Sequence, residues 1–144
     1  MIINSSYVDF GHSERKNPES SIFGNLRTDY YTIADLEESR NLFFGSFGLD
    51  GARNNPYMSP ASESPDIEHV SFVGFPRTLN FVGGAEILRD QNRVLNERMV
   101  RDMGEDNVTY VEMPDAVHDF VSFDWHEPER SQALQIIEAW LQLE

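Results

Sequence analysis

The chain has 144 residues, no cysteine, and a formal net charge of −14 that results from 11 Lys and Arg against 25 Asp and Glu. This length suits one domain, and an apolar content of 40% with ten Phe can supply a hydrophobic core, which argues against wholesale disorder. The negative charge disfavours nucleic-acid and membrane-surface partners, and the lack of Cys excludes a disulfide, a thiolate zinc site and a thiol nucleophile.

The first half of the sequence predicts one strand and one helix among irregular segments. Apolar residues at 1–8 predict a short strand, and the polar stretch 9–31 predicts a loop. Thr32 can cap a helix over residues 33–44, with acidic side chains in its early turns. From 48 to 68, Gly, Asn and Pro predict an ordered but irregular segment.

The second half alternates strands with helices. Strands are predicted at 78–82 and 108–113, with a helix between them at about 87–103. A last helix opens at Pro128 and should bury one stripe of side chains: Ala133, Ile136, Ile137, Trp140 and Leu141. Strand, helix, strand, helix with short connections favours a parallel sheet covered by helices through a right-handed crossover.

Two acid/base groups follow the predicted strands of the second half. Glu86 comes after the 78–82 strand by one tight glycine turn, and His118 follows the 108–113 strand by a short loop. If these strands are neighbours, both side chains emerge at the same sheet edge, where a carboxylate can orient an imidazole. Two other interpretations stay open: Glu86 as an acidic first-turn residue that complements the helix dipole, and His118 as a loop histidine satisfied by backbone.

The remaining candidate groups carry weaker signals. His12 lies in the polar loop, His69 precedes a short apolar stretch, and His126 stands where the last helix begins. One candidate metal site can be drawn from the sequence, and its ligands would be His118, Asp119, Asp124 and His126. This set contains no ligand pair at the helical i, i+4 spacing, and the chain has no Cys, so we expect no metal. We also expect no cofactor. Three aromatic residues are expected in the core: Phe43, Phe44 and Phe47.

Several short motifs occur in one order along the chain: Ser-Tyr-Val-Asp at 6–9, Asn-Pro-Tyr-Met-Ser-Pro at 55–60, Gly-Gly-Ala-Glu-Ile-Leu-Arg-Asp-Gln at 83–91, Tyr-Val-Glu-Met-Pro at 110–114, Val-His-Asp-Phe at 117–120 and Ala-Trp-Leu at 139–141. Together they resemble the C-terminal half of α/β-hydrolase-fold esterases. The branch they resemble is the hormone-sensitive-lipase-like group, which includes fungal steryl-acetyl-hydrolase-like members. The likeness extends over nearly the whole chain.

This resemblance implies a fold and a reaction. The fold is α/β, a partial α/β-hydrolase with about three parallel strands, like strands six to eight, and flanking helices. Residues 1–144 would form a single domain equivalent to the C-terminal half of the catalytic domain. The reaction is carboxylic-ester hydrolysis, with His118 as the base and Glu86 as the acid, where most members carry Asp. Asp90 matches the second Asp of the family pattern and, with Asp119, would support this pair.

The family's nucleophile and oxyanion patterns are missing from the sequence. It contains neither Gly-x-Ser-x-Gly nor His-Gly-Gly. One hypothesis is therefore an esterase that acts on a small ester only when an N-terminal half complements it. A second is a catalytically inactive interaction module that pairs with itself or a partner through its exposed sheet edge. A third makes one serine the nucleophile: Ser46, Ser59 or Ser122.

The sequence also predicts a location. Its start has no basic region and no long apolar run, and no stretch approaches the ~18 apolar residues of a membrane span. We therefore expect a soluble, cytoplasmic protein without a membrane span.

Overall fold

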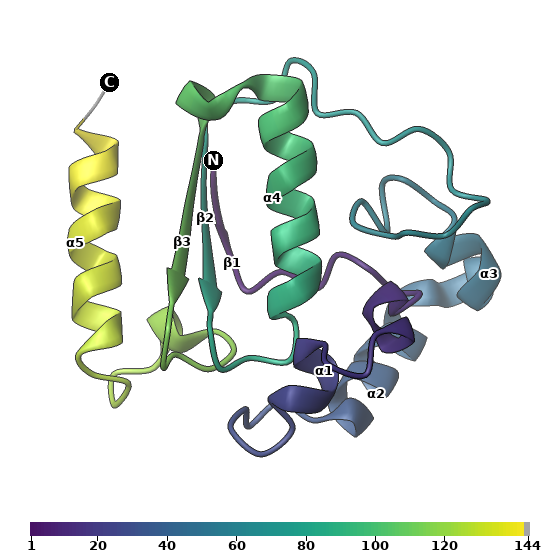
Figure 1. Cartoon of the computed structure of the whole chain (residues 1–144), viewed down its shortest axis with the longest axis horizontal. Coiled ribbons are helices and arrows are strands. Elements are labelled where there is room, and N and C mark those ends of the chain that lie inside the picture. Colours follow the sequence, from purple (N-terminus) through teal and green to yellow (C-terminus); the bar gives the residue numbers. More distant parts are fainter. Residues whose placement is uncertain (143–144) are drawn as a thin grey trace.

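The computed structural model describes residues 1–142, in which three parallel strands form one open sheet (Figure 1). The strands are β1 (Ile2–Asn4), β2 (Thr78–Gly83) and β3 (Val108–Met113), in the order β1-β2-β3. In the register of the sheet, Leu79 of β2 lies opposite Ile2 on one side and Thr109 on the other. The expected α/β class and the pairing of the two later strands are thereby confirmed.

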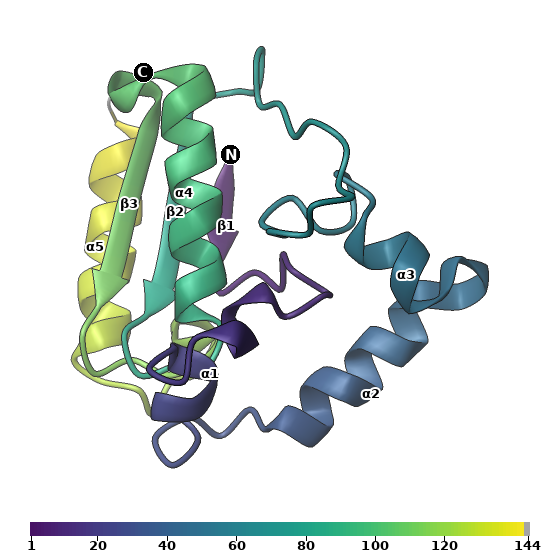
Figure 2. The ribbon, with the colours of Figure 1, turned by 45° about the vertical axis from the view of Figure 1, so that its right-hand side comes forward.

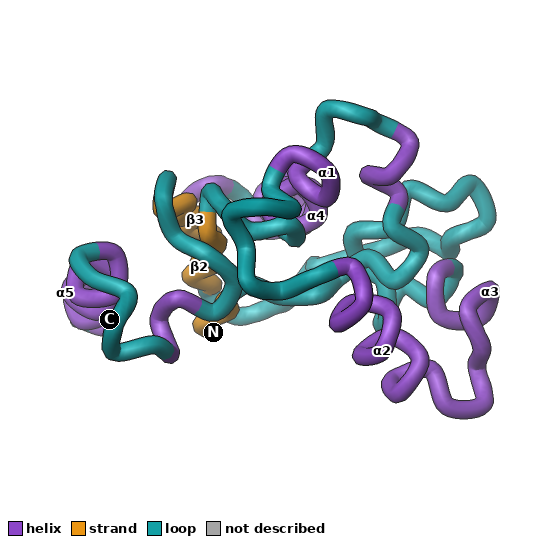
Figure 3. The backbone as a smooth tube through the Cα atoms, turned by 90° about the horizontal axis from the view of Figure 1, so that it is seen from below, coloured by secondary structure: helices purple, strands orange, loops and turns teal. Residues whose placement is uncertain are grey.

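One helix covers each face of the sheet (Figure 3). Helix α5 (Glu129–Leu141) buries Ala133 and Trp140 against Leu79 and Phe81 of β2. On the opposite face, helix α4 (Arg89–Met103) contributes to a second core cluster: Val8, Ala61, Val70, Phe72, Leu95, Met99 and Val108. Successive strand residues point to opposite faces, so β3 contributes Val108 to this second cluster and Met113 to the cluster under α5.

The residues between β1 and β2 lie mostly beside the sheet rather than over it (Figure 2). They include five short or medium helical segments: η1 (Ser13–Lys16), α1 (Ser21–Gly24), α2 (Ile33–Phe44), η2 (Gly45–Phe47) and α3 (Gly48–Arg53). Ile22 of α1 and Leu36 of α2 pack against Ile87 and Leu88, just before α4. The remaining elements are single turns: η3 (Glu105–Asn107) and η4 (Phe120–Ser122).

Where the local signals are strong, the predicted elements match the structure. Thr32 caps α2, because its side chain accepts from the Asp35 amide while the Asp35 carboxylate accepts from the Thr32 amide. Gly104 ends α4 with a φ of 83°. The strand predicted at 108–113 coincides with β3.

Other predicted elements need correction. The first strand is only Ile2–Asn4, because Ser5 adopts a left-handed φ of 46° and turns the chain away. The predicted loop 9–31 contains η1 and α1, and the predicted irregular segment 48–68 begins with α3. Each of these helices has at most six residues, so its stability depends on tertiary packing, which local sequence does not encode.

Three residues expected in the core are exposed. Phe43 and Phe47 are 61% and 60% exposed, whereas Phe44 is buried as expected. Leu141 of the predicted α5 stripe is 52% exposed, because it lies at the last turn of the helix. Among residues 1–142, no helix combines the length and apolar character needed to cross a membrane.

Candidate active site

Two glycines allow the loops after β2 and β3 to touch. Because β2 and β3 are parallel neighbours, both loops leave the sheet at the edge toward which their arrowheads point in Figure 1. The Gly84 amide donates to the Met113 carbonyl at 2.7 Å, and the Ala85 amide donates to the Ala116 carbonyl at 2.9 Å. A Cβ on Gly83 would overlap the backbone of Ala116. This close contact places Glu86 and His118 together at the carboxyl ends of β2 and β3.

Glu86 is fully buried just before α4. Its Oε2 accepts from the Ser5 hydroxyl at 2.6 Å and from the Gly83 amide at 3.0 Å, whereas its Oε1 is buried without a partner. Burial raises the pKa of Glu86 to about 8, and the neighbouring carboxylates of Asp29 and Asp119 act in the same direction. The carboxyl group therefore faces Ser5 and Gly83 rather than capping α4.

His118 presents a mostly buried imidazole. Its ring stacks on the ring of Tyr31, with centroids 4.5 Å apart and planes 11° from parallel. The Nδ1 atom is buried without a partner, and Nε2 lies 3.6 Å from Asp119 Oδ2. Burial lowers the pKa of His118, against the opposing effect of Asp119 and Asp29. The ring is therefore neutral near pH 7, the state in which it can accept a proton.

Two further residues join the loop that carries Glu86, residues 84–88, to the loop that carries His118, residues 114–119. These are called the acid loop and the histidine loop. Asp29 accepts from the Ile87 amide through Oδ2 at 2.8 Å and from the His118 amide through Oδ1 at 3.2 Å. Ser5 Oγ, which donates to Glu86, also accepts from the Asp119 amide at 3.0 Å. The sequence pattern predicts a role for neither residue. Asp29 lies in a polar stretch with no distinguishing pattern, and for Ser5 the only signal is its place near the end of a strand.

The supporting residues expected from the resemblance lie in different places. Asp119 is at the site, where its Oδ1 accepts from Asn4 Nδ2 at 2.9 Å. Asp90 instead joins α1 to α4, because its Oδ2 accepts from the Ser21 amide at 2.8 Å and its Oδ1 lies 3.0 Å from Arg89 Nε.

Two of the three other histidines have structural partners, and the third is exposed. His126 holds the histidine loop, because its Nε2 accepts from the Val117 amide at 3.2 Å. His12 is buried, and its Nε2 is 2.8 Å from the Tyr7 hydroxyl. His69 is exposed.

The three serines considered as nucleophiles do not contact the histidine. Ser59 is buried and donates to the Ala52 carbonyl at 3.0 Å, whereas Ser46 and Ser122 are exposed. Over residues 1–142, no serine hydroxyl is hydrogen-bonded to the His118 ring. In the same range, no three His, Asp or Glu side chains are grouped to hold a metal ion.

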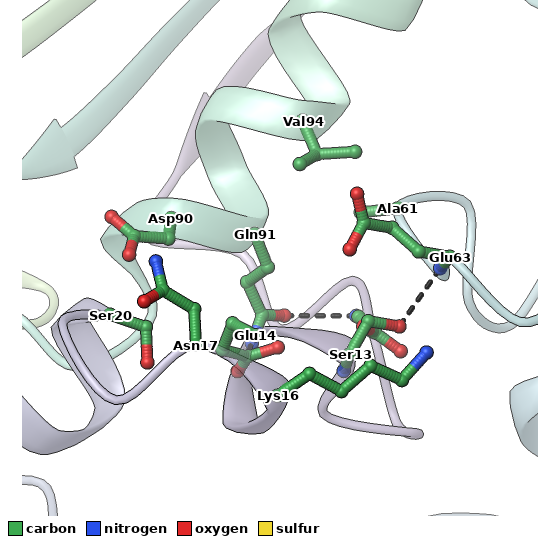
Figure 4. Close-up of a pocket in the computed structure, with 11 residues that line it drawn as sticks. Ser13, Glu14, Lys16, Asn17, Ser20, Ala61, Glu63, Asp90, Gln91 and Val94 are labelled. Carbon is green, nitrogen blue, oxygen red and sulfur yellow. Dashed lines mark hydrogen bonds between the residues drawn. The ribbon is translucent and has the colours of Figure 1, made fainter.

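Two cavities bear on the loops that follow β2 and β3. An apolar cavity of about 390 Å³ reaches Tyr31, whose ring stacks on His118, and its other lining residues are Tyr7, Val8, Phe10, Ser39, Phe43, Tyr57, Met58 and Pro60. A cavity of about 280 Å³ lies between η1 and the start of α4 (Figure 4), and the charged residues that line it are Asp9, Glu14, Lys16, Glu63 and Asp90. Neither Glu86 nor His118 lines either cavity.

Comparison with known proteins places these observations in a family. The sequence model described as alpha/beta hydrolase fold matches residues 3–122. Among solved structures, a hormone-sensitive lipase from a metagenome library superposes with a TM-score of 0.74 at 22% identity over 99% of this chain. The hormone-sensitive-lipase homologue EstE7, also from a metagenome library, gives 0.71 at 24% identity over 99%. Carboxyl esterase 2 of the mycorrhizal fungus Tuber melanosporum gives 0.72 at 16% identity over 94%.

The chain spans less than half the length of these solved structures. It covers 43% of the metagenomic lipase, 43% of EstE7 and 40% of the fungal esterase. No curated protein matches the sequence significantly.

Proposed function

The chain belongs to the alpha/beta hydrolase fold family, and on that basis we propose that it supplies the acid and the base of a carboxylic-ester hydrolase. In this proposal Glu86 orients His118, and His118 removes the proton from a serine hydroxyl as that oxygen attacks the ester carbonyl. The same imidazolium then donates its proton to the leaving alcohol. Asp119, beside Nε2, stabilises the imidazolium.

One observation carries this proposal. Glu86 Oε1 and His118 Nδ1 are both buried without a partner, at the ends of adjacent parallel strands. A buried polar atom without a hydrogen bond lowers the stability of the folded chain by about 1–3 kcal/mol. Two such atoms of complementary chemistry, both following the ends of neighbouring strands, therefore favour a shared function. In a catalytic triad the carboxylate accepts from the imidazole Nδ1–H. Glu86 Oε1 and His118 Nδ1 are not hydrogen-bonded to each other in this structure, and in the proposal that contact forms in the assembled enzyme.

The nucleophile belongs to another segment in this proposal. Neither nucleophile nor oxyanion motif occurs in the sequence, so we assign the attacking serine and the oxyanion donors to an N-terminal half equivalent to the part of the solved esterases that this chain does not cover. The substrate is a small neutral or cationic ester, because the charge of −14 repels anions. Its apolar group fits the cavity that reaches Tyr31.

Complementation tests the proposal directly. The full chain is co-expressed with the N-terminal half of the metagenomic lipase, and hydrolysis of a p-nitrophenyl ester is measured. We expect the assembled protein to hydrolyse the ester and to react once with a fluorophosphonate. The His118→Ala variant should lose at least about 10²-fold in rate, because proton transfer contributes about 10²–10⁴.

A matched control separates catalysis from general damage. His69 is exposed and distant in sequence from both strand ends, so His69→Ala should keep the full rate. The proposal would be contradicted if the assembled protein hydrolysed the ester at the same rate with and without the His118→Ala substitution. The same assay on the chain alone tests whether a serine of this chain serves instead.

A second candidate function rests on an independent observation. Within residues 1–142, β1 pairs only with β2, and α2, η2 and α3 expose a group of large apolar side chains: Leu42, Phe43, Phe47 and Leu49. Open strand edges and contiguous apolar surface are typical of association sites. We therefore propose, as the alternative, an interaction module that self-associates through this edge and this apolar group.

A further inference from the structure

The Ser5 hydroxyl connects the proposed acid to the histidine loop. It donates to Glu86 Oε2 at 2.6 Å and accepts from the amide of Asp119, the residue after His118, at 3.0 Å. A hydroxyl has one proton to donate, and here that proton is committed to the carboxylate. Ser5 is 3% exposed, so water does not compete for either contact.

The backbone of Ser5 is held in an unusual conformation to reach this position. Its φ is 46°, in the left-handed region that non-glycine residues seldom adopt. Its amide donates to the Phe81 carbonyl at 2.9 Å and so continues the β1–β2 pairing. Asp119, at the other end of the link, has a φ of 53°. Such conformations persist where surrounding contacts over-determine them, and they occur preferentially at functional sites.

The link also decides which oxygen of Glu86 is available. Oε2 already accepts from Ser5 and from the Gly83 amide, so only Oε1 remains free. We propose that Ser5 is a positioning residue, which locks Glu86 with Oε1 directed to His118 and fixes the histidine loop through Asp119. This inference rests on the proposed function, because it assigns Ser5 a role in the same acid–histidine pair.

Titration of Glu86 by NMR tests this role in the full chain. With ¹³C-labelled glutamate carboxyls, assigned with a Glu86→Gln variant, we expect the Glu86 midpoint to rise by about one pH unit or more in Ser5→Ala and Ser5→Gly. Removing the donor destabilises only the ionised carboxylate. The other ionisable side chains near Glu86, which are Asp29, Asp119, Tyr30 and the proposed partner His118, are chemically unchanged in both variants.

The choice of variants separates positioning from backbone strain. Glycine accepts the left-handed conformation, so Ser5→Gly should remain folded even if Ser5→Ala does not. Ser6→Ala is the control, because Ser6 contributes its backbone carbonyl to the Asn92 side chain and should keep the midpoint. In the unsubstituted chain the Asp119 amide signal should follow the Glu86 titration, since Ser5 links the two groups.

Each outcome decides the inference. A raised midpoint in Ser5→Gly supports the positioning role, and an unchanged midpoint in that variant, or an Asp119 amide insensitive to the Glu86 titration, overturns it. Because the titration needs no nucleophile, it is independent of the complementation assay. If the assembled protein does not hydrolyse the ester but the Glu86 midpoint is raised in Ser5→Gly, the result counts against the esterase proposal alone.

Discussion

Two buried ionisable side chains have pKa values displaced in opposite directions. Burial raises the pKa of Glu86 to about 8 and lowers that of His118. Near pH 7 both groups are therefore mostly neutral, which is the state that a water-excluded site tolerates best. A carboxyl group that ionises only around pH 8 would place the working range of the proposed acid–histidine pair on the alkaline side of neutrality.

The raised pKa of Glu86 should make folding stability depend on pH. Between the ordinary value of 4.5 and about 8, the folded chain holds a proton on Glu86 that the unfolded chain has lost. The unfolding free energy therefore falls as pH rises through this window, by at most about 1.4 kcal/mol per pH unit. Glu86→Gln lacks this loss, so its stability relative to the unsubstituted chain should increase from pH 5 to pH 8.

Urea unfolding at pH 5, 6, 7 and 8 checks this expectation. The contribution of His118 has the opposite sign: its lowered pKa costs stability as pH falls below its ordinary value of 6.5, and this cost should largely cancel between the two proteins. Glu68→Gln, at an exposed carboxylate, is the matched control and should show a constant difference. A pH-independent difference for Glu86→Gln would contradict the raised pKa.

Among the helices and strands, the sequence predicts those features that are determined by residues close together in the chain. The Thr32 cap, Gly104 and the apolar pattern of β3 act within a few positions, so α2, the end of α4 and β3 could be predicted. The positions of Glu86 and His118 follow from strand order. The roles of Ser5 and Asp29 could not be predicted, because their hydrogen bonds join residues 81 and 89 positions apart.

Gly83, the last residue of β2, should be intolerant of a side chain. A Cβ on Gly83 would meet the backbone of Ala116 and Val117, which cannot move without displacing the histidine loop. Gly83→Ala should therefore lower the unfolding free energy by about 1–3 kcal/mol, the usual cost of overpacking. Gly24→Ala is the control, since nothing lies within 4 Å of its added Cβ. Equal stability of the two variants by denaturant unfolding would contradict this prediction.

For the whole molecule, charge and apolar surface act against each other. The net charge of −14 makes copies repel, whereas the open edge of β1 and the exposed side chains of α2, η2 and α3 favour association. Salt screens the repulsion, with a Debye length of about 10 Å at 0.1 M.

Self-association should therefore strengthen as NaCl is raised from 0.02 to about 0.5 M, because screening removes the repulsion and leaves apolar contact. Sedimentation velocity over a range of protein concentrations measures it. Leu42→Ser with Phe47→Ser should weaken the association, whereas Val73→Ser, 75% exposed outside this group, should not. A strictly monomeric chain at every salt concentration would contradict the interaction-module alternative.

The hydrogen bond from the Asp119 amide to Ser5 closes a separation of 114 positions along the chain. Contacts of such long range form only after a large loss of chain entropy, so the histidine loop should become ordered late in folding. The Asp119 amide should then exchange with solvent deuterium only through openings that separate Asp119 from Ser5. Its exchange rate would thus report on cooperative unfolding of the sheet rather than on local fluctuation of the loop.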